Sequence, residues 1–175
     1  MEFVDEKSTV ALGPGIGTHP ETRELVARLG RDLACPMVID ADGINNLAGA
    51  GAGLKDAPGP RILTPHPGEM ARLVGITTPE VQARRLDLAR ETAAKFGVTL
   101  VLKGAQTVVA APDGRVWLNS TGNPALASGG TGTCSPASSA VFWPRAWPPG
   151  TPPAWASTST AWPPIFLSAG TGNGE

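Results

Sequence analysis

The segment PRILTPHPGEMARLVG, residues 60–75, carries the signals of a strand, a turn and a helix in succession. The short apolar run before Thr64 is typical of a buried strand, and the Pro-His-Pro-Gly turn ends it because proline cannot donate to a central ladder. The apolar residues after Gly68 recur at helical spacing. Two prolines restrict the backbone around His66, and Glu69 stands where its charge complements a helix N-terminus. The segment therefore predicts a strand–turn–helix unit with polar side chains at the carboxyl end of the strand.

Similar units precede this segment. Residues TVALGPGIG (9–17) predict a strand that runs into a glycine turn, and PMVIDADGINNL (36–47) predicts a strand followed by two carboxylates and the start of a helix. Strands that alternate with helices indicate an α/β domain with a mostly parallel central sheet flanked by helices.

Two longer helices are predicted between the strands. PETRELVARLGRDL (20–33) has the pattern of an amphipathic helix, with its leucines on one face. TPEVQARRLDLARETAAKFG (78–97) is the clearest helical pattern in the chain. The supporting positions are Leu25, Leu29 and Leu33 in the first helix, and in the second Thr78 as the cap, Pro79 in the first turn and Gly97 at the end.

The segment 98–132 supplies a further strand, a hairpin around the turn Pro112-Asp113-Gly114, and a glycine loop. That loop, Gly129 to Gly132, has the sequence GGTG. Glycines around a threonine leave backbone N–H groups free to converge on an anion, and such loops normally open a helix. The sequence therefore predicts a phosphate-binding loop here.

Polar motifs follow four of the predicted strands, and the carboxyl ends of strands form the ligand crevice of open α/β sheets. Each motif also has a structural interpretation. The glycines can serve a tight turn, Asp42 can cap a helix, Glu69 can complement a helix dipole, and Lys103 can extend along a sheet edge. Four such motifs together favour a binding site; they are Gly13–Gly17, Asp40–Asn45, His66–Glu69 and Lys103–Thr107.

Composition excludes several classes of protein. The chain has 175 residues and a net charge of −1, which argues against a nucleic-acid or anionic-membrane partner. No apolar run reaches the roughly 18 residues of a transmembrane helix, and the polar N-terminus is unlike a secretory signal. Cys35 and Cys134 are too few for a disulfide framework or a zinc cluster. These features predict a cytoplasmic protein.

The order of the motifs GPGIG, VIDADGIN, TPHPGE, VLKGAQT and NSTGNPALASGGTG resembles the C-terminal half of the ADP-dependent NAD(P)H-hydrate dehydratases. The resemblance covers residues 9–132, and TPHPGE with GGTG is its most specific part. It implies a ribokinase-like fold, incomplete in this chain. It also implies repair of hydrated NADH or NADPH, in which ADP or ATP phosphorylates the ring hydroxyl and loss of phosphate regenerates the dinucleotide.

The resemblance implies roles for particular residues. Gly17 and His66 would contact the hydrated dinucleotide, and Glu69 would organise Mg²⁺ through water. The adenine nucleotide would be bound by Lys103, Gly104, Ala105, Gln106 and Thr107, with Gly132 beside its phosphate. The resemblance further implies a homo-oligomer and an epimerase, as a partner or a fused domain.

The sequence departs from the family at residue 133. The family's loop continues with an aspartate that takes the proton from the substrate hydroxyl, whereas this chain has Thr133, a poor general base. The resemblance also implies that part of the family's domain precedes residue 1. We therefore expect a partial dehydratase domain over 1–132 that lacks the intact catalytic base and is inactive.

Residues 133–175 differ in kind from the rest of the chain. After residue 133 the only charged side chains are Arg145 and Glu175, while this segment has four of the five tryptophans and eight of the eighteen prolines. Shifting the reading frame by one base would make each first codon base a middle base, and the segment then encodes an acid-like residue followed by an apolar helix. We therefore expect an aberrant, disordered tail that is out of frame.

Two other functions remain open from the sequence. One is a small-molecule kinase of the same fold, which an assay of ADP-dependent loss of hydrated NADH against kinase turnover would distinguish. The other is a non-catalytic nucleotide-binding fragment, which would bind ADP without turnover.

Overall fold

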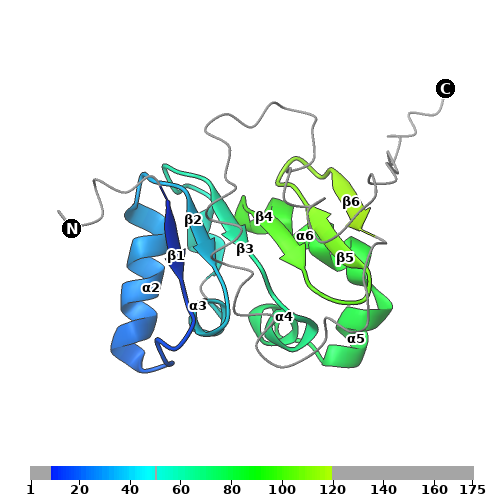
Figure 1. The fold of residues 1–175 in the computed structure, drawn as a ribbon, viewed down its shortest axis with the longest axis horizontal. Helices are drawn as coiled ribbons and strands as arrows, with labels where there is room; N and C mark the ends of the chain where they lie inside the picture. The colour runs from blue at the N-terminus through cyan, green and yellow to red at the C-terminus, as the bar shows by residue number, and fades with distance from the viewer. Residues whose placement is uncertain (1–8, 50, 120–175) are drawn as a thin grey trace.

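The described residues form one mixed sheet whose strands follow the order of the chain. The computed structural model describes residues 9–49 and 51–119. Neighbours from β1 to β4 pair in parallel, and β5 and β6 continue the sheet antiparallel, in the order β1-β2-β3-β4-β5-β6 (Figure 1). This sheet confirms the predicted α/β class. The strands are β1 Val10–Leu12, β2 Met37–Ile39, β3 Arg61–Leu63, β4 Thr99–Leu102, β5 Thr107–Ala110 and β6 Val116–Asn119.

The described helices cover one face of the sheet. Their buried apolar residues share a single cluster with the alternate strand residues Met37, Ile39, Leu63, Leu100 and Leu102. Side chains alternate between the two faces of a strand, so these strand residues all point to the helical layer. The helices are α2 Pro20–Asp32, α3 Asp42–Asn46, α4 Pro67–Val74, α5 Thr78–Ala83 and α6 Arg85–Phe96, with a 3₁₀ turn η1 at Gly51–Leu54.

The opposite face carries a second, smaller cluster. It consists of strand residues and Ala111, with no residue of a described helix. The alternation that places Val38, Ile62 and Val101 on this face continues to Asp40, Thr64 and Lys103 just beyond the strands. Polar residues therefore stand at the carboxyl end of this apolar face. The cluster is Val38, Ile62, Val101, Val109, Ala111 and Trp117.

The helix predicted at 20–33 is confirmed as α2, but its predicted face is wrong in part. Leu25 is 53% exposed, whereas Val26 is fully buried and Leu33 is 4% exposed. The stripe that contacts the core follows Val26, Leu29 and Leu33, because a helical turn of 3.6 residues places Val26 about 100° away from Leu25.

The helix predicted at 78–97 is two helices. The break lies at Arg84, whose φ of −128° and ψ of 34° are not helical. The N-cap is Thr77 rather than Thr78, since the Thr77 side chain accepts from the Glu80 N–H and the Glu80 carboxylate accepts from the Thr77 N–H. Gly97 is confirmed as the terminator, with a left-handed φ of 66°.

The hairpin predicted around residues 112–114 joins β5 to β6, and the Gly114 N–H donates to the Ala111 carbonyl at 3.1 Å. A second antiparallel connection, between β4 and β5, was not predicted. Within residues 9–49 and 51–119, no helix has the length and apolar character needed to span a membrane. The predictions for the glycine loop and for the tail concern residues outside the described ones.

Candidate functional site

The turn after β1 lies against the end of β2 and requires glycine. Gly13 has a φ of 141°, and a Cβ there would stand 1.8 Å from the carbonyl oxygen of Asp40. The Asp40 N–H in turn donates to the Leu12 carbonyl at 3.0 Å. The backbones thus meet closely, which brings the first two polar motifs together.

The backbone N–H and carbonyl of Gly17, a predicted substrate-binding residue, are both hydrogen-bonded to side chains of α3, the helix that follows β2. Its N–H donates to Asp42 Oδ2 at 3.1 Å, and its carbonyl accepts from Asn46 Nδ2 at 2.8 Å. The interpretation of Asp42 as a helix cap is wrong, because Ala41 occupies the N-cap position and makes no side-chain cap bond. The Asp42 carboxylate instead bonds to Gly17 and, at 3.3 Å, to Asn45.

Ala41 has a strained backbone that the sequence did not reveal. Its φ of 48° and ψ of −122° suit glycine rather than alanine. The turn is closed by a hydrogen bond from the Gly43 N–H to the Asp40 carbonyl at 2.9 Å. Strain of this kind persists where surrounding contacts impose it, and it collects at functional sites.

Lys103 pairs with a buried carboxylate. Its ammonium lies 2.8 Å from Asp40 Oδ1, and the two side chains are 26% and 4% exposed. The pair joins the end of β4 to the end of β2, and the Lys103 N–H also donates to the Pro65 carbonyl at 2.8 Å. The structure thus gives Lys103 an acidic partner rather than a free position along the sheet edge.

His66 and Glu69 form a reciprocal cap at the start of α4. His66 Nδ1 accepts from the Gly68 and Glu69 N–H groups at 2.9 and 3.3 Å, and Glu69 Oε2 accepts from the His66 N–H at 2.8 Å. A neutral imidazole that accepts at Nδ1 carries its proton on Nε2. These hydrogen bonds fix the orientation of the imidazole. Because the His66 side chain is half-exposed, the ring is also accessible to a ligand.

Glu69 and its neighbours do not form a ready-made metal centre. Glu69 Oε1 lies 3.3 Å from His66 Nε2, and its side chain is 7% exposed. Among the described residues, no group of three or more histidine, cysteine or acidic side chains could hold a metal ion. Mg²⁺ keeps several waters and binds phosphate oxygens well, so a role of Glu69 through water is compatible with this arrangement.

The loop between β4 and β5 turns its carbonyl groups toward a guanidinium. Arg85 Nη2 donates to the carbonyls of Leu102, Lys103 and Gln106 at 3.0, 3.2 and 2.9 Å. Burial lowers the pKa of Arg85 from its ordinary value. No sequence pattern indicates this role, because Arg85 belongs to a charged helical pattern that is typical of a solvent-exposed face.

Two buried polar atoms at this edge of the sheet lack partners among the described residues. They are Thr64 Oγ1, directly after β3, and Asn46 Oδ1, in α3. Thr64 and Asn46 are 1% and 0% exposed. Buried polar atoms are normally hydrogen-bonded, so these two atoms are exceptions among the described residues.

The structure therefore brings four sequence motifs to one edge of the sheet. Contacts link Gly17 to Asp42 and Asp40 to Lys103, and Lys103 is bonded to the residue before His66. An ammonium, a fixed imidazole and a loop rich in glycine can together bind an anionic ligand. Gly132 and Thr133, the remaining predicted positions, lie outside the described residues.

Comparison of the sequence with known proteins identifies a family of related enzymes. Residues 2–134 match the family model of the NAD(P)H-hydrate dehydratases. The bifunctional NAD(P)H-hydrate repair enzyme Nnr of Thermofilum pendens is 44% identical over 132 residues, which are 75% of this chain and 25% of that protein. The ADP-dependent (S)-NAD(P)H-hydrate dehydratase of Bacillus subtilis is 44% identical over 125 residues, which are 70% of this chain and 42% of that protein.

Solved structures agree with the sequence comparison. The ADP/ATP-dependent NAD(P)H-hydrate dehydratase of Bacillus subtilis, co-crystallized with ATP/Mg²⁺, has a TM-score of 0.62 and 42% identity, covering 73% of this chain and 44% of that one. A ribokinase-like superfamily protein from Enterococcus faecalis has a TM-score of 0.65 and 26% identity, covering 81% and 49%. The predicted ribokinase-like fold is thereby confirmed. The chain spans less than half the length of these relatives, and it belongs to the NAD(P)H-hydrate dehydratase family.

Proposed function

We propose that this chain contains the binding residues for the ADP-dependent dehydration of (6S)-NAD(P)H hydrate. The observation that carries the proposal is the meeting of the Gly17 turn, His66 and the Lys103 loop at one edge of the sheet. Family membership over residues 2–134 supports the same reaction. In it, a phosphoryl group passes from ADP to the ring hydroxyl of the hydrate, which loses its proton, and AMP is left. Phosphate then departs together with a proton from the adjacent ring carbon, which leaves NADH or NADPH.

The described residues suit a reaction that depends on position and charge. Phosphoryl transfer is catalysed chiefly by holding the reacting groups in line and neutralising the phosphates. Lys103 to Thr107 would bind the adenine nucleotide, and Gly17 and His66 would contact the hydrated nicotinamide. Mg²⁺, when bound, neutralises phosphate charge, and Glu69 would act on it through water.

We propose that the chain binds these ligands but turns them over slowly or not at all. Thr133 stands where the resemblance implies an aspartate, and a threonine hydroxyl does not accept a proton near neutral pH. A non-catalytic nucleotide-binding protein is therefore the second candidate, and the identity of residue 133 is the observation that favours it.

Titration with ADP and an assay of hydrated NADH test both parts. We expect ADP to bind, and Lys103→Met to weaken binding about tenfold because it removes a charged partner. Lys55→Met is the control, since Lys55 is exposed and lies beside Gly97, which precedes the start of β4, whereas Lys103 follows its end. Failure of the unchanged chain to bind ADP would contradict the binding proposal.

Turnover decides the catalytic part. We expect negligible recovery of NADH from its hydrate with the unchanged chain and with Thr133→Asp, because the expected out-of-frame tail persists in that variant, and measurable recovery only when the reading frame is restored from codon 133. Turnover by the unchanged chain at a rate that Thr133→Asp does not increase would show that residue 133 does not limit the reaction. Nucleotide sequencing across codon 133 tests the frame: an uninterrupted frame with no missing base would contradict the predicted frameshift.

A further inference from the structure

In the loop from Lys103 to Gln106, carbonyl groups accept hydrogen bonds from neighbouring side chains, whereas three backbone N–H groups have no partner among the described residues. Arg85 Nη2 donates to the carbonyl oxygens of Leu102, Lys103 and Gln106, and the Thr107 hydroxyl donates to the Gly104 carbonyl at 3.3 Å. The N–H groups of Gly104, Ala105 and Gln106 have no hydrogen-bond partner within residues 9–49 and 51–119. All three residues are exposed, so a ligand can reach the loop.

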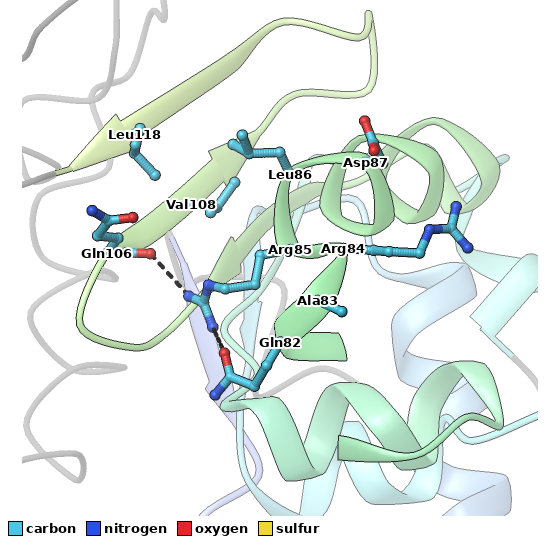
Figure 2. Close-up of a pocket in the computed structure, with 9 residues that line it drawn as sticks. All are labelled: Gln82, Ala83, Arg84, Arg85, Leu86, Asp87, Gln106, Val108 and Leu118. Carbon is cyan, nitrogen blue, oxygen red and sulfur yellow. Dashed lines mark hydrogen bonds between the residues drawn. The ribbon is translucent and has the colours of Figure 1, made fainter. Parts of the chain in front are cut away.

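Arg85 itself is oriented by the helix that precedes it. Its Nη1 donates to Gln82 Oε1 at 3.0 Å, so the guanidinium is held between α5 and the loop (Figure 2). A pocket of about 290 Å³ lies here, lined by Gln82, Arg85, Gln106, Val108 and Leu118 among others. The break at Arg84 separates α5 from α6 and directs the two successive arginine side chains to opposite sides, as Figure 2 shows.

The close approach of the guanidinium also accounts for Gly104. Its φ is 151°, and a Cβ at this position would stand 2.8 Å from Arg85 Nη2. A side chain at residue 104 would therefore push the guanidinium away from the carbonyls. Gly104 and Arg85 form one arrangement, in which the glycine makes room for the cation.

We propose that Arg85 is a positioning residue for nucleotide binding: by bonding the carbonyls of the 103–106 loop, it turns the loop's free N–H groups toward the phosphates or base of ADP. The inference rests on the proposed function, because it assumes that this loop binds the nucleotide. A cation behind the loop satisfies carbonyl dipoles that would otherwise face an anionic ligand. It also adds positive potential beneath the donors.

The test compares Arg85→Met with Arg84→Met. Both substitutions remove one positive charge from adjacent residues that line the same pocket, but Arg84 bonds to Glu91 at 3.2 Å rather than to the loop. We expect Arg85→Met to raise the Kd for ADP about tenfold, and Arg84→Met to change it less than about twofold. In the absence of nucleotide, the amide NMR shifts of Gly104, Ala105 and Gln106 should move in Arg85→Met alone.

Two further results separate the possible failures. If the unchanged chain binds ADP and Arg85→Met binds it equally well, the inference is overturned while the proposed function stands. If the unchanged chain does not bind ADP, the proposed function and the nucleotide role of Arg85 both fail. The amide NMR shifts of Gly104, Ala105 and Gln106 then report only whether Arg85 holds the loop in place. Should Arg85→Met not unfold cooperatively in urea, Arg85→Lys decides. The lysine side chain is one bond shorter than the arginine side chain is to Nη2, so its ammonium would lie farther from the three carbonyls and should still weaken ADP binding.

Discussion

At the scale of single residues, the junction between the first two strands depends on the absence of a side chain at Gly13. We predict that Gly13→Ala destabilises the protein by about 3 kcal/mol or more, because the new Cβ would overlap the Asp40 carbonyl oxygen, 1.8 Å away. Gly15→Ala is the control: its φ of 74° is also left-handed, but nothing lies within 4 Å of the new Cβ. That change should cost about 1 kcal/mol, the ordinary cost of this conformation. Urea unfolding measures both, and equal losses would contradict the steric argument.

The pair formed by Asp40 and Lys103 is the other residue-scale feature that holds the site. We predict that Asp40→Asn lowers the free energy of unfolding by about 2 kcal/mol. The Asp40 side chain is only 4% exposed, and the substitution removes the carboxylate that lies 2.8 Å from the Lys103 ammonium. Asp32→Asn is the matched change, because Asp32 lies 2.7 Å from Arg31 on the surface, where water screens the pair. Denaturant midpoints should shift for the first and not for the second. The same shift in both variants would mean that burial does not matter.

At the scale of elements, the capping boxes at the start of α4 and α5 show how local sequence begins a helix. In α5, hydrogen bonds from the Thr77 side chain and backbone lower the pKa of Glu80. A carboxylate with a lowered folded pKa stabilises the protein above its unfolded pKa, and this stabilisation is lost as the pH falls through the folded pKa. We predict that Thr77→Ala raises the pKa of Glu80 toward its ordinary value, as measured by carboxyl NMR titration. An unchanged pKa would contradict the capping geometry.

Prediction from sequence succeeded for elements whose signals are local. The proline-flanked turn before α4, the hairpin at residues 112–114 and the glycine that ends α6 lie where the sequence placed them. It failed where packing against neighbouring elements determines the end of a helix or the face that is buried. Arg84 interrupts a continuous helical pattern, and Leu25 is exposed because packing against the sheet selects the adjacent stripe of α2. Amphipathic spacing alone does not distinguish stripes that differ by one residue.

At the scale of the whole molecule, the sheet is apolar on both faces. We predict that Ile62→Ala and Leu63→Ala each destabilise the protein by about 3 kcal/mol, because each side chain is fully buried. Ile62 lies in the cluster that contains no residue of a described helix, and Leu63 lies in the cluster shared with the described helices. Thermal or urea unfolding of the two variants makes the comparison. A negligible loss for Ile62→Ala beside a large one for Leu63→Ala would show that the second face is open to water in solution.

The sequence by itself determined the α/β class, the strand ends that carry polar motifs, and the family to which these motifs belong. These properties follow from short-range patterns: apolar runs, proline and glycine at turns, and the order of the motifs along the chain. Only the tertiary structure decided that Asp40 pairs with Lys103, 63 residues away, and that Arg85 bonds the loop after β4. The reason is physical: a side chain's partner depends on which strands become neighbours, and that depends on burial across the whole sheet rather than on the residues beside it.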